Sequence, residues 1–314
     1  MVSINLKRTF YLTLFLLLSC ASPAEQNPII NLESKDAKTF GNALSLWRID
    51  HANARVYLLG SVHALKPEHY PLAKPIERAY NASDNAVFEI DLAKMSSYQI
   101  ALVMQELASY SGSESLESEL SESTMRLLVR YLGENKLDSD TYSQFKPWWV
   151  TLQIALFEMS KSGYKTKLGI DQYFQEKARA EGKPIFQLES FQEQIELLAG
   201  DSSDVQDLSL KVALIEIDSV NILIAQLVNA WQRGAVDEMH ALSKQDEGKY
   251  PELKKQMERL LDKRNVKMAK SISHYLGQDG SYFVVVGALH MGGPMGLINL
   301  LAKDYFIEQI YDTQ

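Results

Sequence analysis

Two stretches at opposite ends of the chain share one pattern: Val56-Tyr57-Leu58-Leu59-Gly60-Ser61-Val62-His63 and Val284-Val285-Val286-Gly287-Ala288-Leu289-His290. Each is an apolar run typical of a buried strand, followed by Gly, two residues and His. Far fewer than one Gly-x-x-His match is expected by chance from 16 Gly and 6 His in 314 residues. A glycine at a strand end permits a sharp turn, and the histidine then lies just beyond the sheet edge, where α/β folds bind ligands. The pattern predicts one site assembled from both ends of the chain.

Outward from these stretches, apolar periodicity and turn residues predict an α+β fold. Strands are expected towards both ends of the chain, as a hairpin of 45–50 and 55–59 and as strands at 86–92, 184–188, 282–286 and about 306–311. Helices are expected from 71 or 75 to 80, at 96–164 with a polar interruption at 111–121, and at 171–181, 191–199, 205–231, 252–276 and 295–302. This order predicts a central mixed sheet built from both chain ends and covered by a large helical insertion.

The N-terminus is typical of a secretory signal peptide, because a positive segment precedes an apolar core, Phe10 to Leu18, that is too short to span a bilayer. The core runs into Leu17-Leu18-Ser19-Cys20, which resembles a bacterial lipobox; the alternative is an ordinary signal peptide with an incidental cysteine. Cys20 is the single cysteine and no Asp follows it, which favours lipidation and an anchor in the outer membrane, facing the periplasm. We therefore expect a lipoprotein signal peptide at 1–19, a flexible tether at 20–40 and one domain at 41–314.

Composition limits the partners of this chain. The 32 Lys and Arg against 40 Asp and Glu give a net charge of −8 without a basic stripe, which excludes nucleic acid as a partner. Because Cys20 stands alone, no internal disulfide or thiolate metal site can form, and any metal must be held by histidines and carboxylates. The expected partners are a peptide or small-molecule substrate, and the membrane through the N-terminal lipid.

Three residues are candidate metal ligands. His63 and His290 form the matched pair at the strand ends, whereas a single histidine would more often have a structural role. Glu89 lies in the expected strand 86–92, where a buried carboxylate is costly unless a cation or several donors satisfy it. If that strand lies at the edge of the sheet, Glu89 is simply solvated. Two imidazoles and one carboxylate would form an open ligand set with room for water and substrate.

Three further residues are candidates for catalysis. Arg264 lies within the apolar stripe of the expected helix 252–276, and Asn265 lies on the same side. An inward Arg needs a carboxylate or an anionic ligand to offset its desolvation, but an Arg at the edge of the stripe would reach solvent. Glu189 follows the expected strand 184–188 and precedes a helix, so it is either a helix cap or a site carboxylate.

Together these motifs resemble the TraB/GumN family, whose members include the TIKI metalloproteases. The matching segments follow one another in order: Leu58 to His63 with Tyr70 to Leu72, Phe88 to Leu92, Gly169 to Asp171 with Phe174, Gly182-Lys183, Leu188-Glu189, Arg264-Asn265 with Met268-Ala269, and Val284 to His290. The resemblance covers the chain from about residue 43 to its end. It implies the wider fold of erythromycin esterases and ChaN-like haem-binding proteins.

In TIKI-like members the two Gly-x-x-His motifs and the glutamate serve a divalent metal, manganese or cobalt rather than zinc, in peptide hydrolysis. The resemblance therefore implies a metal at His63, Glu89 and His290, with Glu189, Arg264 and Asn265 beside it. Two departures weaken this transfer: Leu289 replaces a small residue of many members, and Asp304 replaces a common Gly. Most bacterial members have no established substrate.

The leading hypothesis is a metal-dependent hydrolase, most consistent with a peptidase, anchored in the cell envelope. Glu89 or Glu189 would take a proton from water, and Arg264 would stabilise an oxyanion or hold a substrate carboxylate. Two alternatives stay open. One is a non-catalytic envelope lipoprotein that binds haem or another ligand through the histidine pair, and the other is an interaction protein that keeps the site as a scaffold.

Overall fold

A computed structural model describes residues 42–244 and 248–313 of the chain, so Cys20, the expected signal peptide and the whole of the expected tether lie outside the described residues. The described strands form one mixed sheet in the order β4-β3-β5-β2-β1-β6. Their bounds are β1 Ala43–His51, β2 Ala54–Ser61, β3 Asn85–Phe88, β4 Ile185–Gln187, β5 Gly280–Gly287 and β6 Ile307–Tyr311. The predictions of an α+β fold and of a sheet built from both chain ends are confirmed.

The two strands that carry the repeated motif are neighbours in the sheet. β2 and β5 pair in parallel, with Gly60 opposite Val286 and Ser61 opposite Gly287, so both motifs end at the same edge. β3 pairs in parallel with β5 on its other side, and β1 is antiparallel to β2 and β6. Helices cover both faces of the central strands, which explains why β5 is an unbroken apolar run and not an alternating one.

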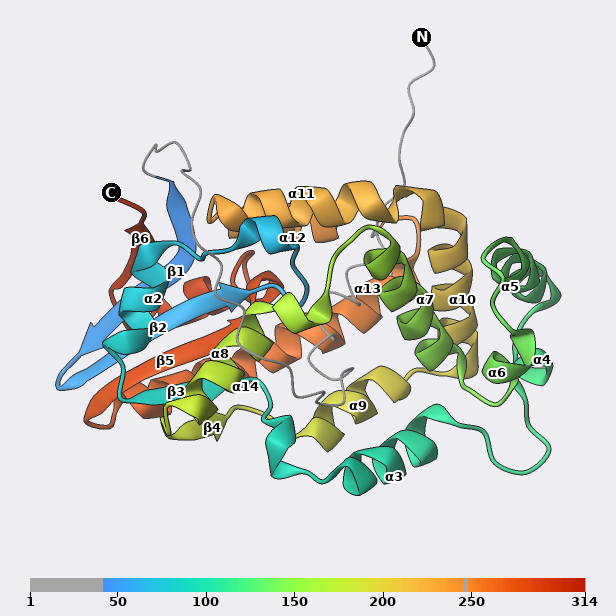
Figure 1. Ribbon diagram of the computed structural model, residues 1–314, viewed down its shortest axis with the longest axis horizontal. Helices are drawn as coiled ribbons and strands as arrows, with labels where there is room; N and C mark the ends of the chain where they lie inside the picture. Colours follow the sequence, from blue (N-terminus) through green and yellow to red (C-terminus); the bar gives the residue numbers. More distant parts are fainter. Residues whose placement is uncertain (1–41, 245–247, 314) are drawn as a thin grey trace, which may run out of the picture.

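Helices hold the sheet on both faces. Figure 1 shows α2 (Lys74–Asn81) and α8 (Ile170–Ala180) in front of the sheet and α14 (Lys263–Leu276) behind it. The front layer is centred on three buried rings, with Phe174 5.2 Å from Tyr80 and 4.8 Å from Phe283 between ring centroids. Gly182, with a φ of 67°, follows the end of α8, where glycine readily adopts this left-handed conformation.

Helix α11 (Val220–Gln232) runs along β1 and is tied to the sheet by Trp231. The indole Nε1 donates to the carbonyl of Gly60 at 2.7 Å, and the carbonyl of Trp231 accepts from the hydroxyl of Ser45 at 2.8 Å. Helix α12 (Val236–Ser243) follows and packs against the turn that carries His290.

Most of the other helices form a half of their own: α3 Ser97–Ala108, α4 Leu116–Glu119, α5 Glu122–Glu134, α6 Ser139–Ser143, α7 Pro147–Lys161, α9 Phe191–Ala199, α10 Ser203–Glu216 and α13 Pro251–Met257. The short α15, Leu297–Leu301, packs against α14. Figure 1 shows that α3 to α7 and α10 lie beyond the carboxyl ends of the central strands, and not over a face of the sheet as expected. A second apolar core between α5, α7 and α10, with Leu128, Val150 and Leu210 fully or almost fully buried, explains this position.

Three expected elements are shortened or interrupted in the structure. The strand predicted at 86–92 ends at Phe88, because the backbone carbonyl of Glu89 turns to accept from the amides of Leu188 and Glu189. The helix predicted at 205–231 is divided by a 3-10 turn at Ile217–Ser219. The helix predicted at 252–276 contains a π-helical turn at Glu258–Asp262, whose Leu260 carbonyl accepts from the guanidinium of Arg264.

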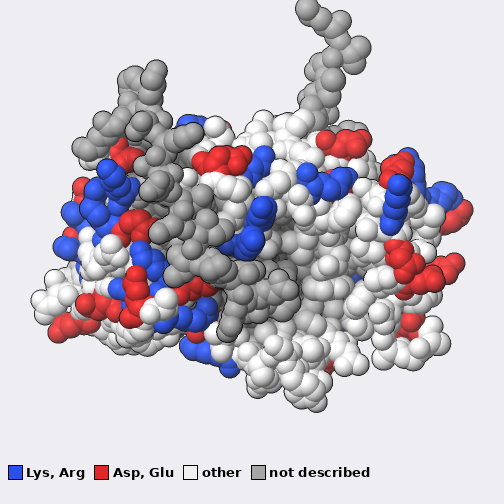
Figure 2. All heavy atoms as spheres, viewed as in Figure 1, with Lys and Arg blue, Asp and Glu red and all other residues white. Residues whose placement is uncertain are grey.

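Charged side chains are unevenly distributed on the surface. Figure 2 shows both signs mixed at the two ends of the molecule, whereas the lower middle of this face, over α3, carries almost no charge. Helix α3 has Glu106 as its single charged residue, and Tyr98 and Leu102 are exposed on it. No helix in the described part of the chain is both long and apolar enough to span a bilayer.

Candidate functional site

The candidate site lies where three parallel strands end. His63 comes two residues after β2, Glu89 directly after β3, and His290 in the 3-10 turn Ala288–His290 after β5. Their exposed fractions are 3%, 2% and 0%. The strand ends bring together the three predicted ligands from sequence positions up to 227 residues apart, as expected from the matched motifs.

Glu89 is not solvated. Its Oε1 accepts from the backbone amide of Gly287 at 2.7 Å, and its Oε2 accepts from Nη2 of Arg264 at 2.7 Å and from Nε2 of Gln194 at 3.0 Å. A buried carboxylate with three donors, one of them charged, is held in a single orientation. The reading of Glu89 as an exposed edge residue is therefore wrong.

Arg264 bridges two carboxylates. Besides Glu89, it contacts Glu189, which accepts from Nε at 3.0 and 3.1 Å and from Nη2 at 2.7 Å. The guanidinium is buried, so the alternative of an Arg reaching solvent is wrong. Ser190 caps α9 with a side-chain hydrogen bond, which leaves Glu189 one residue earlier to face the site. Glu189 is thus a site carboxylate and not the helix cap.

Each histidine is oriented through Nδ1 by a different partner. Nδ1 of His63 lies 2.7 Å from Oδ2 of Asp171, whose Oδ1 accepts from the hydroxyl of Ser61 at 2.9 Å. Nδ1 of His290 lies 2.5 Å from Oδ1 of Asn265, while Nδ2 of Asn265 donates to the carbonyl of Met295 at 2.8 Å. Both imidazoles therefore carry their Nδ1 proton toward a fixed acceptor, an arrangement common in metal-ligating histidines.

The Nε2 side of both imidazole rings lies near Gly287. Nε2 of His63 and Nε2 of His290 are buried and have no hydrogen-bond partner within the described structure. A Cβ on Gly287 would lie 3.6 Å from Nε2 of His63, 3.2 Å from Oε1 of Glu89 and 3.6 Å from the ring of His290. Gly287 therefore keeps side-chain atoms out of the place where both imidazoles and the carboxylate converge.

The buried charges do not balance. The described residues of the site include three buried carboxylates, those of Glu89, Asp171 and Glu189, but one buried guanidinium, that of Arg264. With both imidazoles neutral, the cluster has two excess negative charges. Uncompensated buried charge is costly, so this cluster favours the binding of either protons or a divalent cation.

The pKa values of the site respond to this imbalance. Burial raises the pKa of Glu89, and Arg264 and His63 offset this only in part. Burial alone would lower the pKa of His63, but the carboxylates of Asp171 and Glu89 together outweigh it and hold the pKa above its ordinary value. Burial and the neighbouring Arg264 lower the pKa of His290 well below its ordinary value, so this imidazole is neutral.

The candidate ligand atoms are of types that bind a divalent cation, but the distances between them are not those of a formed metal site. No group of three or more His, Cys, Asp and Glu side chains within residues 42–244 and 248–313 has the arrangement of a metal site. Nε2 of His290 and Oε1 of Glu89 are 4.0 Å apart, whereas two ligands of one tetrahedral zinc ion lie about 3.4 Å apart. The donor types, the unpartnered nitrogens and the excess negative charge nevertheless fit a divalent ion.

Three site residues were not predicted as such. Asp171 and Ser61 lie in segments that match the family pattern, but nothing in their spacing indicates a contact with His63. Gln194 has no sequence signal, because a glutamine on a capped helix is ordinarily a surface residue. Asn265 was expected beside the site and contacts His290 directly.

Comparison with known proteins places the chain among relatives of low identity. The model of the TraB/PrgY/gumN family matches residues 45–309. The uncharacterized protein YbaP of Escherichia coli strain K12 is 22% identical over 251 residues, which cover 79% of this chain and 88% of YbaP. YbaP of Shigella flexneri matches with the same identity and coverage. No solved structure matches the chain significantly.

Proposed function

The chain belongs to the TraB/PrgY/gumN family, and on this premise we propose that its buried site is a divalent-metal-dependent hydrolytic centre, with a peptide as the substrate class. One observation carries the proposal: two imidazole rings, each with an Nε2 that has no partner, and a carboxylate oxygen converge beside Gly287. The two excess negative charges of the cluster support a divalent cation over a neutral ligand. His63, His290 and Glu89 would hold it, and manganese or cobalt is our choice.

A bound divalent ion would supply Lewis acidity toward a carbonyl oxygen and an activated water at neutral pH. The protein's own residues have separate tasks around it. Both oxygens of Glu189 contact Arg264, whereas Oε1 of Glu89 faces the converging nitrogens. Glu89 is therefore the carboxylate suited to act as a ligand, and Glu189 holds Arg264 in place.

The arrangement changes the expected role of Arg264. Its Nε, Nη1 and Nη2 all donate to acceptors of the protein, namely Glu189, the Leu260 carbonyl and Glu89. We assign it to positioning the two carboxylates and not to binding an oxyanion directly. Asn265 has the corresponding task for His290, because it fixes the Nδ1 side of the ring. Burial and the neighbouring Arg264 keep this imidazole neutral, with Nε2 available as an acceptor.

Metal analysis of the full chain tests the proposal. The wild type, His63→Ala, His290→Ala and Gly287→Ala are loaded with Mn²⁺, Co²⁺ or Zn²⁺, desalted and measured for metal content. We expect one equivalent in the wild type and loss in all three variants. A wild type that binds none of these ions would rule out the proposal, and a haem-type absorption band with haemin that is lost in His63→Ala would support ligand binding instead.

Activity is tested with the metal-loaded protein and a peptide library. Glu89→Gln should abolish turnover, because it replaces the anionic ligand by a neutral amide while keeping the side-chain shape and one carbonyl acceptor. Turnover equal to that of the wild type would contradict the role of Glu89. A protein that binds metal but cleaves no peptide would support the metal site and exclude a peptide as the substrate.

We also propose that the protein is a lipoprotein anchored in the cell envelope through Cys20, facing the periplasm at the outer membrane. The support is the sequence Leu17-Leu18-Ser19-Cys20 after an apolar core. Expression with a radiolabelled fatty acid should label the wild type and not Cys20→Ala, and membrane fractionation should release the variant. Equal labelling of both would contradict the proposal.

A further inference from the structure

The turn that follows His290 lies directly against helix α12. A Cβ on Gly292 would be 2.3 Å from the carbonyl oxygen of Val236, and a Cβ on Gly293 would be 2.4 Å from the ring of His240. Gly293 also has a φ of +80°, which side chains other than glycine rarely adopt. Backbone of the turn and the first half of α12 are therefore in immediate contact.

Hydrogen bonds hold the same turn from three sides. The amide of Gly293 donates to Oδ1 of Asp237 at 2.8 Å, and its carbonyl accepts from Nδ2 of Asn299 at 2.8 Å. Two residues further on, the carbonyl of Met295 accepts from Asn265, which also bonds the imidazole of His290. The turn thus connects α12 to the site histidine over three residues.

We propose that Asp237 and His240 are positioning residues of the site, which fix the turn 291–293 and thereby the imidazole of His290. The side chain of His290 makes its hydrogen bond at Nδ1 only, so the place of Nε2 depends on where the backbone of the turn lies. Asp237 acts through the Gly293 amide, and the His240 ring fills the place that a side chain on Gly293 would take. The consequence for metal affinity rests on the proposed function; the positioning itself does not.

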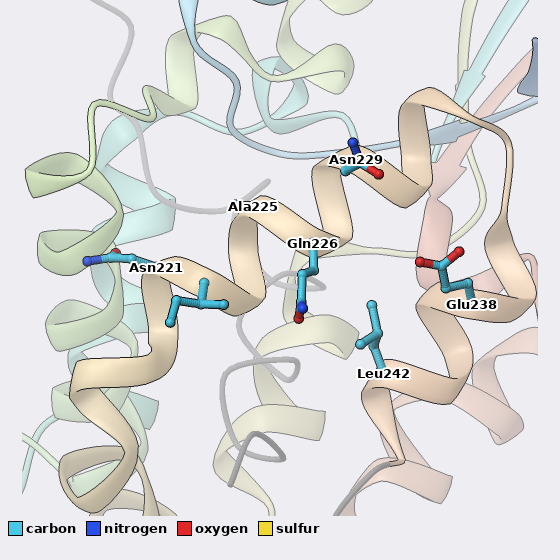
Figure 3. A pocket seen from close by; sticks show the side chains of 7 residues that line it. Asn221, Ala225, Gln226, Asn229, Glu238 and Leu242 are labelled. Atoms are coloured by element: carbon cyan, nitrogen blue, oxygen red, sulfur yellow. The ribbon is translucent and has the colours of Figure 1, made fainter. Parts of the chain in front are cut away.

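The neighbouring residue provides a matched control. Glu238 is the next carboxylate on the same helix, but it pairs with Arg233 at 2.9 Å and lies about half exposed. Figure 3 shows Glu238 and Leu242 of α12 facing a groove shared with Asn229 and Gln226 of α11. Removing the Glu238 carboxylate therefore changes the charge of α12 equally without touching the turn.

Histidine signals in the nuclear magnetic resonance spectrum test the positioning without any metal. The full chain is labelled with ¹⁵N-histidine, and the His290 ring signals are assigned from their loss in His290→Ala. Asp237→Ala should shift the His290 signals, because the Nδ1 contact to Asn265 changes, whereas Asp237→Asn should restore them, since its carbonyl still accepts from Gly293. Glu238→Ala should leave them unchanged. Unchanged His290 signals in Asp237→Ala, with the fold intact by circular dichroism, would overturn the inference.

Mn²⁺ titration of the same variants then tests the functional consequence. Asp237→Ala should weaken binding by about tenfold, as loss of an outer-shell contact typically does, while Asp237→Asn and Glu238→Ala bind as the wild type. Failure of the wild type to bind Mn²⁺ would count against the proposed function alone. Normal affinity of Asp237→Ala in a binding wild type would count against the inference.

Discussion

Nδ1 of His63 lies 2.7 Å from the carboxylate of Asp171, although 108 residues separate the two in the chain. The corresponding nitrogen of His290 contacts a neutral amide, that of Asn265. The two sequence motifs are alike, but their partners differ in charge, and the pKa values of the two imidazoles move in opposite directions. The Asp171 carboxylate thus favours the protonated form of His63, whereas burial and the neighbouring Arg264 favour the neutral form of His290.

Replacing Asp171 should affect stability and site together. Asp171→Ala leaves the His63 Nδ1 and the Ser61 hydroxyl buried without their acceptor, which should lower the free energy of unfolding by about 3 kcal/mol. Urea unfolding measures this loss. Asp50→Ala, which removes an exposed carboxylate paired with Arg55, should cost about 0.5 kcal/mol and serves as the control. Equal losses in both variants would contradict the role of Asp171.

A methyl group on Gly287 should block the site while every donor stays. Its Cβ would lie 3.2 Å from Oε1 of Glu89, so we expect Gly287→Ala to fold and to bind Mn²⁺ at least about tenfold more weakly. Calorimetric titration measures the affinity. Gly277→Ala is the control, because a Cβ there meets its nearest neighbour at an ordinary 3.5 Å. Wild-type affinity in Gly287→Ala would show that the cation does not bind beside this residue.

Removing Arg264 should be costly because of what it leaves behind. Arg264→Ala places the carboxylates of Glu89 and Glu189 together in the interior without a cation, which should lower the free energy of unfolding by about 4 kcal/mol. Arg264→Ala with Glu189→Gln removes one of these charges and should recover part of that loss. Urea unfolding of both variants measures the difference. A double variant less stable than the single one would contradict the explanation by charge.

Glu193 should give a pH-dependent contribution at the start of α9. Its side chain accepts from Lys267 and from the Ser190 amide, and these contacts lower its pKa from 4.5 to about 2. A lowered pKa contributes stability that is present above about pH 4.5 and is lost as the pH falls toward 2. Because Glu193 and Lys267 are half exposed, Glu193→Gln should cost only about 1 kcal/mol at pH 7.

Urea unfolding of the wild type and Glu193→Gln at pH 7, 4 and 3 measures this contribution. The difference in the free energy of unfolding between the two proteins should become smaller at each lower pH. A constant difference would mean that the capping geometry matters and the charge does not.

The sequence alone determined the sheet and the place of the site. Apolar runs in β2 and β5 end in the same Gly-x-x-His motif, and parallel strands buried on both faces place such ends at one edge. Arg264 within an apolar stripe and Glu89 within an expected strand were recognisable because buried charge needs a partner. Both signals are local, since they depend on residue type and period.

Only the tertiary structure decided which partners these charges found. Asp171 and Gln194 come from helices remote in sequence, and neither carries a pattern that sets it apart from a surface residue. The π-helical turn before Arg264 and the early end of β3 at Phe88 also follow from contacts across the fold. Hydrogen-bond partners and charge balance depend on distances between segments that the chain order does not fix, and so the second layer of the site, with Asp237 behind His290, emerged from the structure alone.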